Sequence, residues 1–342
     1  MIFFIGIVNY IIDPLWCFNK NIAFGENQDG FNERQQKTNK ITFTPFDYDT
    51  LIIGSSRTTY INQNDFEGTH AFNYACSNMD PYEYNGYIEY AKKINKKPFK
   101  KIIIGVDFFR TNEKNPSQFE NPIFYINKSN SFLYRLKNLI SLDALRFSLG
   151  NVAKKYISSN YFGYSRITNV KYMNKIDEEY KKKLIKCEFK EYSKRYGKKY
   201  KYRNIKKIFN TLKNNNRDTE FIVFTTPVSK VLLELINQQG RLIDYKKWIR
   251  DCVQSFGKLY NFMYLNDITK NLDNYKDLDH FKPEVGSLIA QRITGYTTPK
   301  ARDFGVLVTK NNMEQHLKFI DNNFRALNDI FKKKDTPPHS TH

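Results

Sequence analysis

Strand-like and helix-like segments alternate along most of the chain, and this alternation is the feature that most restricts its fold. Short apolar or β-branched runs bounded by turn residues predict five strands, over residues 48–54, 70–75, 100–109, 220–226 and 261–267. Helical spacing of apolar residues predicts helices, over residues 81–96, 228–239, 242–260 and 283–296. Because strands that alternate with helices form mostly parallel sheets covered on both faces, we predict an α/β fold with a mostly parallel five-stranded sheet.

The predicted α/β domain covers residues 46–299. Residues 111–217 are too long for one crossover between strands, and their Lys-, Tyr- and Asn-rich sequence predicts a mainly helical insertion. This insertion is interpreted either as a lid or cap over a substrate or as a surface elaboration. The polar residues 18–45 predict a linker. Residues 300–342 predict a C-terminal extension with one apolar run at 304–308, a helical stretch and a disordered tail.

The composition bounds the class of protein. The 342-residue chain is 40% hydrophobic and 16% aromatic, which excludes a disordered protein. It carries 55 Lys and Arg against 35 Asp and Glu, a formal net charge of +20. This excess favours contact with polyanions such as nucleic acid, anionic lipid or acidic polysaccharide, but widely spread lysines are also typical of a solvated surface. No nucleic-acid-binding motif occurs, so no nucleic-acid partner is expected. Four cysteines without a CxxC pair predict neither a zinc site nor a disulfide framework.

Residues 1–17 are the most hydrophobic part of the chain. Only about a dozen residues precede Asp13-Pro14, fewer than the roughly 20 that a helix needs to cross a bilayer. No basic region precedes this segment, and no small-residue cleavage motif follows it. A truncated membrane anchor, an interfacial segment and a buried first helix all fit. Asn9 and Asp13-Pro14 favour the anchor, because they resemble its exit into a soluble domain.

A serine follows the first predicted strand directly. Residues 50–53 are apolar or β-branched, Gly54 permits a tight turn, and Ser55, Ser56 and Arg57 come next. In parallel α/β sheets, ligands bind at the carboxyl ends of the strands. Ser56 is therefore predicted to lie where a substrate binds.

Asp277 precedes His280 by three residues in a loop after the last predicted strand. Pro283 begins a helix behind this loop, as proline favours the first helical position. A hydroxyl, an imidazole and a carboxylate are the parts of an activated serine nucleophile. We therefore predict that Ser56 attacks, His280 moves the proton and Asp277 orients the imidazole. More than two hundred residues separate Ser56 from Asp277 and His280, so only the fold can bring them together.

In this order the motifs resemble those of the SGNH/GDSL hydrolase superfamily, over roughly residues 48–295. Gly54-Ser55-Ser56 is similar to the Gly-Asp-Ser motif, with Ser55 where the aspartate usually stands. The DLDH sequence at 277–280 matches the Asp-x-x-His motif. The resemblance implies a flavodoxin-like three-layer fold, acyl-ester chemistry at Ser56 and no cofactor.

The two middle motifs depart from the family pattern. Asn78 stands where the family has a glycine that lends its backbone N–H to the oxyanion hole, which would then consist of Ser56 and Asn78. Asp107 stands near the place of the family's asparagine donor, and an ionised carboxylate accepts hydrogen bonds but does not donate them. Arg57 and Asp107 are therefore interpreted as substrate-contacting or site-shaping residues, with an ion pair between them as one role for Asp107.

The resemblance implies a serine esterase, a deacetylase or an O-acetyltransferase that acts on a cell-envelope glycan. Expected partners are an acylated carbohydrate, a membrane contacted through the N-terminus and an acyl-donor membrane protein. The expected location is the extracytoplasmic face of the cytoplasmic membrane.

Two other classes of function stay open. One is a non-catalytic envelope assembly or binding protein with a degenerate site. The other is a metal-dependent phosphoesterase that uses Asp273, Asp277, Asp279 and His280, although it lacks the second histidine group that such sites usually need.

Overall fold

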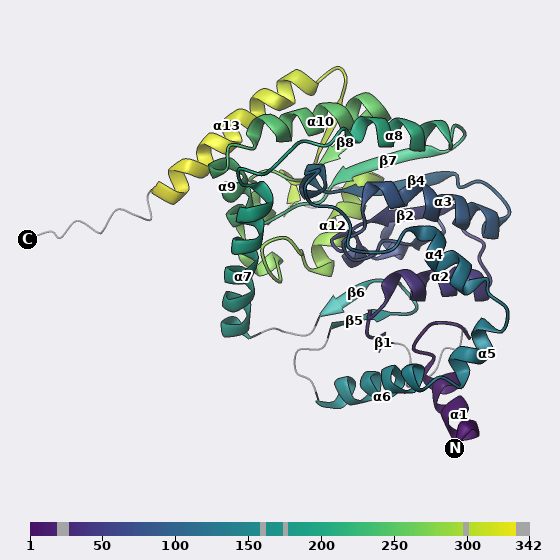
Figure 1. Ribbon diagram of the computed structural model, residues 1–342. Coiled ribbons are helices and arrows are strands. Elements are labelled where there is room, and N and C mark those ends of the chain that lie inside the picture. The colour runs from purple at the N-terminus through teal and green to yellow at the C-terminus, as the bar shows by residue number, and fades with distance from the viewer. Residues whose placement is uncertain (19–26, 158–161, 174–176, 297–300, 333–342) are drawn as a thin grey trace, which may run out of the picture.

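The computed structural model describes residues 1–18, 27–157, 162–173, 177–296 and 301–332 (Figure 1). A six-stranded sheet forms its centre, in the order β3-β2-β4-β7-β8-β9. Its strands are β2 (Thr50–Gly54), β3 (Ala71–Asn73), β4 (Lys101–Val106), β7 (Glu220–Thr225), β8 (Lys258–Asn261) and β9 (Val306–Thr309). Neighbouring strands are parallel except β8 and β9, which are antiparallel. The prediction of an α/β fold with a mostly parallel sheet is confirmed.

Helices cover both faces of this sheet, because alternate residues of the central strands point to opposite sides. Leu51 and Ile53 pack into a core with α3 (Pro81–Asn95), α8 (Ile205–Asn214), α9 (Lys230–Gln238) and α10 (Leu242–Phe256). Ile52 and Ile103 pack into a second core with the short helix η1 (Thr58–Tyr60) and with α12 (Pro283–Thr294). The Ile102-Ile103-Ile104 run is therefore buried on both faces.

The prediction of five strands is wrong at the C-terminal end of the chain. Strand β9 pairs with β8 as a sixth strand, and α13 (Met313–Lys332) packs against α9 and α10. Most of the predicted C-terminal extension is thus part of the α/β body, whereas the predicted disordered tail (332–342) lies, apart from Lys332 at the end of α13, outside the described residues. The fifth strand also lies earlier than predicted, at Lys258–Asn261, because the apolar residues after it are buried in a loop.

The predicted linker over 18–45 contains a helix. Helix α2 (Glu33–Phe43) consists mostly of polar residues, yet Arg34, Gln35 and Lys37 on it are buried. Their charged groups are paired: Arg34 binds Glu83 through two hydrogen bonds, and Lys37 donates to the carbonyl of Ala75. Hydropathy gives no sign of such a helix, because hydrogen bonds and ion pairs rather than apolar contacts hold it inside.

The region between β4 and β7 is mainly helical in its described part. It contains α4 (Pro122–Ser129), α5 (Tyr134–Leu139), α6 (Leu142–Ile157), α7 (Glu178–Tyr196) and α8, after the short helix η3 (Phe108–Thr111). Its strands β5 (Phe162–Ser165) and β6 (Lys171–Met173) form a small antiparallel sheet with β1 (Asn27–Gln28). Helix α7 packs against α9 and so lies beside the carboxyl ends of the main strands.

Helix α1 (Ile2–Ile12) packs against α5 and α6, away from the main sheet (Figure 1). None of the described helices is long and apolar enough to cross a membrane. The remaining short helices, η2 (Gln63–Asp65), α11 (Asp267–Lys270) and η4 (Leu272–Asn274), lie in loops that follow the main strands.

Candidate active site

The turn that carries Ser56 depends on two glycines. Strand β2 ends at Gly54, which pairs with Gly105 of β4. A Cβ atom on Gly54 or Gly105 would lie 2.2 Å or 2.1 Å from the hydroxyl oxygen of Thr58. The two glycines therefore make room for Thr58, and the chain passes at once from β2 through Ser56 into η1.

The loop that carries His280 is held by Asp277. One carboxylate oxygen of Asp277 accepts the backbone N–H groups of Asp279 (3.1 Å) and His280 (2.7 Å). The backbone N–H of Lys276 donates to the carbonyl of His280 at 2.9 Å and closes the loop. Such a turn is typical of aspartate, whose side chain bonds to backbone groups a few residues ahead.

Ser56, His280 and Asp277 form one chain of contacts. The Ser56 Oγ atom lies 2.9 Å from His280 Nε2, and His280 Nδ1 lies 2.9 Å from Asp277 Oδ2. These distances lie within the range for a nucleophile, its base and an orienting group. The predicted meeting of the two loops is confirmed. Ser56 and His280 are half-buried, whereas Asp277 is buried.

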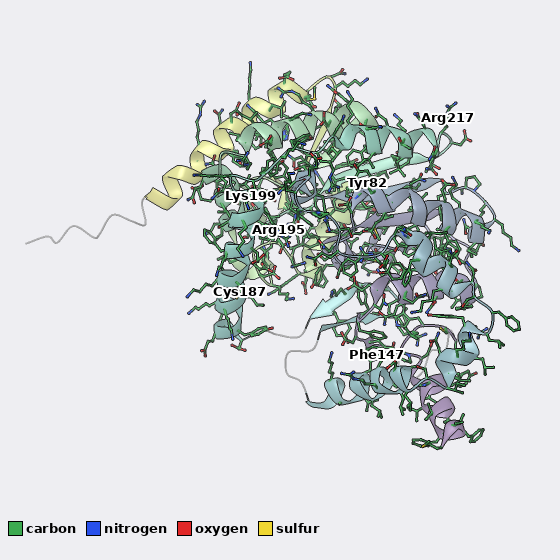
Figure 2. All side chains as sticks on the ribbon, in the orientation of Figure 1. Tyr82, Phe147, Cys187, Arg195, Lys199 and Arg217 are labelled. Carbon is green, nitrogen blue, oxygen red and sulfur yellow. The ribbon has the colours of Figure 1, made fainter. Side chains whose placement is uncertain are left out.

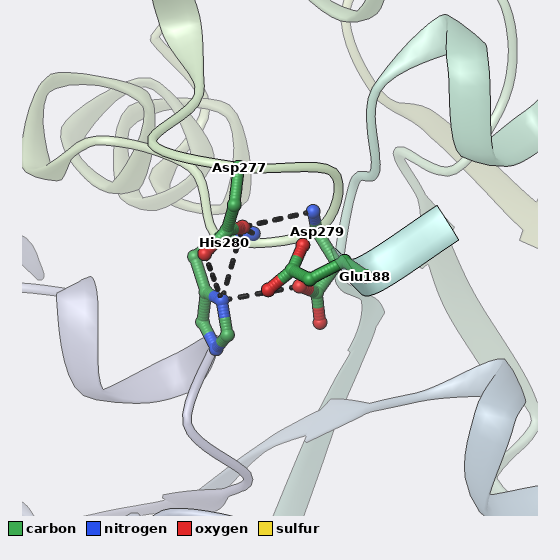
Figure 3. Close-up of side chains that lie close together, drawn as sticks. All are labelled: Glu188, Asp277, Asp279 and His280. Atoms are coloured by element: carbon green, nitrogen blue, oxygen red, sulfur yellow. Dashed lines mark hydrogen bonds and ion pairs between the residues drawn. The ribbon is translucent and has the colours of Figure 1, made fainter. Parts of the chain in front are cut away.

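Two further carboxylates lie close to the imidazole. Asp279 Oδ1 lies 3.1 Å from His280 Nδ1, and Glu188 of α7 accepts the backbone N–H of Leu278 at 2.9 Å. Figure 3 shows Asp277, Asp279 and Glu188 on one side of the ring, with Nε2 pointing away from them. Sequence reasoning missed Glu188, because nothing marks one glutamate among the many charged residues of α7.

The same cluster is the candidate metal centre among the described residues. One ligand atom each from Glu188, Asp277, Asp279 and His280 lies within 4.8 Å of the others. Asp273, predicted as a ligand, does not belong to it: its side chain is exposed and faces Lys181 at 3.7 Å. A cation would have to share His280 Nδ1 with Asp277 and Asp279, which already hold that nitrogen.

Arg57 lies fully buried beneath the serine turn. Its guanidinium contacts Asp279 (3.0 Å), Asp107 (3.3 Å) and the hydroxyl of Tyr192 (3.0 Å). Asp107 also accepts the hydroxyl of Thr226 at 2.6 Å. Of the two interpretations of Arg57 and Asp107, this geometry favours site-shaping residues, because the pair holds the serine turn, the histidine loop and α7 together.

Burial and neighbouring charges shift the pKa values of the side chains in this cluster. Burial acts to lower the pKa of His280, but the carboxylates of Asp277 and Asp279 outweigh burial and raise it to about 10. Burial, together with negative Asp279 and Asp277, raises the pKa of Glu188 to about 9. Burial also acts to raise the pKa of Asp279, yet His280 and Arg57 hold it well below its usual range. Near neutral pH these shifts favour an imidazolium at His280 and a protonated carboxyl at Glu188.

Asn78 adopts the left-handed backbone conformation, with φ 56°. Glycine and asparagine tolerate this conformation best, so an asparagine fits this position. Its backbone carbonyl and its side-chain oxygen both accept hydrogen bonds from Arg110. Within the described ranges, the backbone N–H groups of Ser56 and Asn78 donate to no backbone carbonyl.

Comparison with protein-family models, with curated proteins and with solved structures found no match for the chain. The case for a function therefore depends on the geometry and chemistry of this site.

Proposed function

We propose that the protein is a serine-dependent acyl-ester hydrolase or O-acyltransferase of the SGNH type, with a flavodoxin-like three-layer fold. The observation that carries the proposal is the continuous contact from Ser56 Oγ through His280 to Asp277. The expected substrate is an acylated carbohydrate of the cell envelope, supplied in the transferase case by an acyl-donor membrane protein. The expected location is the extracytoplasmic face of the cytoplasmic membrane, with contact through the N-terminal segment. Substrate and location rest on the resemblance in sequence motifs.

In the proposed reaction, Ser56 Oγ bonds to the ester carbonyl carbon while its proton passes to His280 Nε2. The carbonyl oxygen becomes an oxyanion, which the backbone N–H groups of Ser56 and Asn78 stabilise. The intermediate then expels the alcohol, which takes the proton from Nε2, and an acyl-serine remains. Water or a sugar hydroxyl attacks this acyl-serine in the second half, with His280 again accepting and returning the proton.

The proposed site lacks the amide donor that the superfamily usually places near position 107. Asp107 is engaged with Arg57 and Thr226, so it is not a substitute for that donor. One missing oxyanion-hole donor typically lowers the rate by about 10² to 10³. We therefore expect slower turnover than in a complete site of this type.

Labelling with a fluorophosphonate probe tests the proposal, because this probe reacts only with an activated serine. Wild-type protein should be labelled, Ser56→Ala should not, and His280→Ala should be labelled much more slowly. Equal labelling of all three proteins would refute the assignment of Ser56. If none of the three is labelled, the non-catalytic assembly or binding protein becomes the better explanation.

The second candidate, a metal-dependent phosphoesterase, is favoured by the cluster of Glu188, Asp277, Asp279 and His280. It predicts hydrolysis of a phosphodiester that a chelator abolishes and that Ser56→Ala leaves intact. A serine enzyme predicts the opposite response to both treatments.

The rate of ester hydrolysis is expected to rise with pH. The imidazole of His280 must lose its extra proton before Nε2 can accept that of Ser56, and its pKa is raised to about 10. The neutral fraction, and with it kcat/KM, should rise by about tenfold per pH unit above neutrality and level off near pH 10. A pH profile of kcat/KM checks this, and a profile that is flat from neutrality upward would contradict the role of His280 as base.

The free energy of unfolding should fall as the pH rises over the range in which kcat/KM increases. A pKa raised from 6.5 to about 10 contributes stability that is fully present below pH 6.5 and is lost as pH rises towards 10. Urea unfolding at several pH values measures this loss of stability. It shows whether any fall in kcat/KM at high pH comes from unfolding of the protein.

Gly286→Ala is expected to slow labelling of Ser56 by about 10- to 100-fold. A Cβ atom on Gly286 would lie 2.6 Å from the backbone carbonyl oxygen of Tyr60, so α12 would have to move away from η1. That movement separates His280 from Ser56, and a displacement of about 1 Å costs up to about 10² in rate. The rate constant for labelling with the fluorophosphonate probe measures this effect.

Gly150→Ala is the matched control for this prediction, because Gly150 lies in α6 and a Cβ atom there meets nothing within 4 Å. It should be labelled at the wild-type rate. Equal rates for Gly286→Ala and Gly150→Ala would show that the contact between α12 and η1 does not set the Ser56–His280 distance.

A further inference from the structure

Exposed apolar side chains are concentrated in two segments of the chain. Of the 25 large hydrophobic side chains that are exposed in the described part of the chain, 17 belong to residues 1–11 and 119–149. We call those in or beside α1, α5 and α6 the docking face: Met1, Ile2, Phe3, Phe4, Ile7, Tyr10, Ile11, Phe132, Leu133, Leu136, Ile140, Leu142 and Leu149. The side chains of α4 are left out because α4 packs on α2 and α3, and Phe147 is left out because its ring stacks on Phe31. A concentration of this kind marks an interaction surface rather than the usual scatter of single apolar residues.

The two segments are joined in the fold by Asn9 of α1. Its side-chain amide donates to the carbonyls of Leu139 (2.9 Å) and Ser141 (3.0 Å), and its oxygen accepts the hydroxyl of Ser148 (3.0 Å). The bond to Leu139 satisfies a carbonyl at the end of α5, where helices leave such groups unpaired. Helix α1 is thus fixed against α5 and α6, and the three helices lie together at one end of the molecule (Figure 1).

Helix α1 is apolar on nearly all sides, but only one side of it is covered. Ile5, Asn9 and Ile12 are buried, whereas Phe3 and Phe4 are 82% and 67% exposed. A helix that is hydrophobic all round is normally buried. Phe147 of α6 (Figure 2), in contrast, is only 37% exposed, and its ring stacks on that of Phe31.

Basic side chains accompany the docking face. Lys128, Arg135, Lys137 and Arg146 are exposed within the segment 119–149, against the exposed acidic residues Glu120 and Asp143. Apolar and aromatic side chains with interspersed Lys and Arg are the pattern of helices that lie in the interface of an anionic bilayer.

We propose that the docking face binds the surface of an anionic lipid bilayer, with the tips of Phe3, Phe4 and Phe132 inserted among the acyl chains. Phe132 is 84% exposed, and protruding aromatic tips suit a fluid lipid layer better than a complementary protein surface. The residues of the insertion, and not the N-terminal segment alone, make this contact. The inference does not depend on the proposed chemistry at Ser56.

Co-sedimentation of the full chain with lipid vesicles tests this inference. Binding is expected to phosphatidylcholine vesicles that contain phosphatidylglycerol. The double variant Phe3→Ser/Phe132→Ser should bind about tenfold or more weakly, because each lost ring removes apolar surface from the acyl region. The double variant Lys137→Gln/Arg146→Gln should weaken binding by about fivefold per removed charge, and only on vesicles with phosphatidylglycerol.

The matched control is Ile243→Ser/Phe319→Ser, which removes exposed apolar side chains from α10 and α13, outside the docking face. It should bind vesicles as the wild type does. Equal binding by the control and the Phe3→Ser/Phe132→Ser variant, or no binding by the wild type, would overturn the proposal. A second copy of the chain is the other possible partner of this face, and sedimentation velocity tests for it. Self-association that Phe3→Ser/Phe132→Ser abolishes, in a protein that does not bind vesicles, would assign the docking face to a second copy.

Discussion

Ser56→Ala should lower kcat for hydrolysis of a simple ester such as p-nitrophenyl acetate by on the order of 10⁴ to 10⁶. The substitution removes the hydroxyl oxygen that lies 2.9 Å from His280 Nε2. Without it, no acyl-serine forms, and only binding and oxyanion stabilisation are left. Steady-state kinetics with purified wild-type and variant protein measure the effect, with thermal unfolding as the check on folding.

Ser55→Ala is the matched control for this experiment. Ser55 is the preceding residue and is fully buried, and its hydroxyl only accepts the backbone N–H of Arg57, at 3.4 Å. Its loss should cost some stability but change kcat little. If Ser55→Ala and Ser56→Ala reduced kcat equally, the serine turn as a whole, and not the Ser56 hydroxyl, would be responsible.

Arg57→Met should lower the free energy of unfolding by about 3 to 5 kcal/mol. The side chains of Arg57 and Asp107 have no exposed surface, and that of Asp279 is 4% exposed. Removal of the guanidinium would leave Asp107 in the interior without its ion-pair partner and Asp279 with His280 alone, and such poorly compensated burial is costly. Urea unfolding at neutral pH measures the change from the midpoint and slope of the transition.

Lys194→Met provides the comparison for a surface ion pair. Lys194 lies 3.1 Å from Glu191 on α7, and both side chains are more than half exposed. Solvent screens such pairs, so this change should hardly move the urea midpoint. An Arg57→Met protein as stable as Lys194→Met would show that Asp107 and Asp279 find other compensation.

The sequence predicted those parts of the site whose structure is local. The turn after Gly54 and the Asp277-x-x-His280 loop before Pro283 are both closed by hydrogen bonds between near neighbours, such as the bond from the Thr58 N–H to the Ser55 carbonyl. That the turn and the loop lie close together could be inferred because parallel strands present their carboxyl ends at one edge of the sheet. Position along that edge, not residue identity, made the pairing of Ser56 with His280 predictable.

Other parts of the fold and of the site could not be predicted from the sequence, because they depend on contacts with segments that are distant in the chain. Strand β9 is recognisable only from its pairing with β8. Helix α2 is buried through individually paired polar groups, such as Arg34 with Glu83. Glu188 reaches His280 because α7 packs on α9, and no periodicity in a Lys-rich helix shows which of its carboxylates faces inward.

The Ser56–His280 contact joins residues 224 positions apart, and Glu188 enters from a third segment. Closing loops of that length is among the last events of folding, since their entropy is lost before distant contacts repay it. A chain still emerging from the ribosome, or one whose sheet has not closed, therefore carries an ordinary, unreactive alcohol. The reactive hydroxyl arises only with the finished molecule, which makes probe labelling a direct readout of correctly assembled protein.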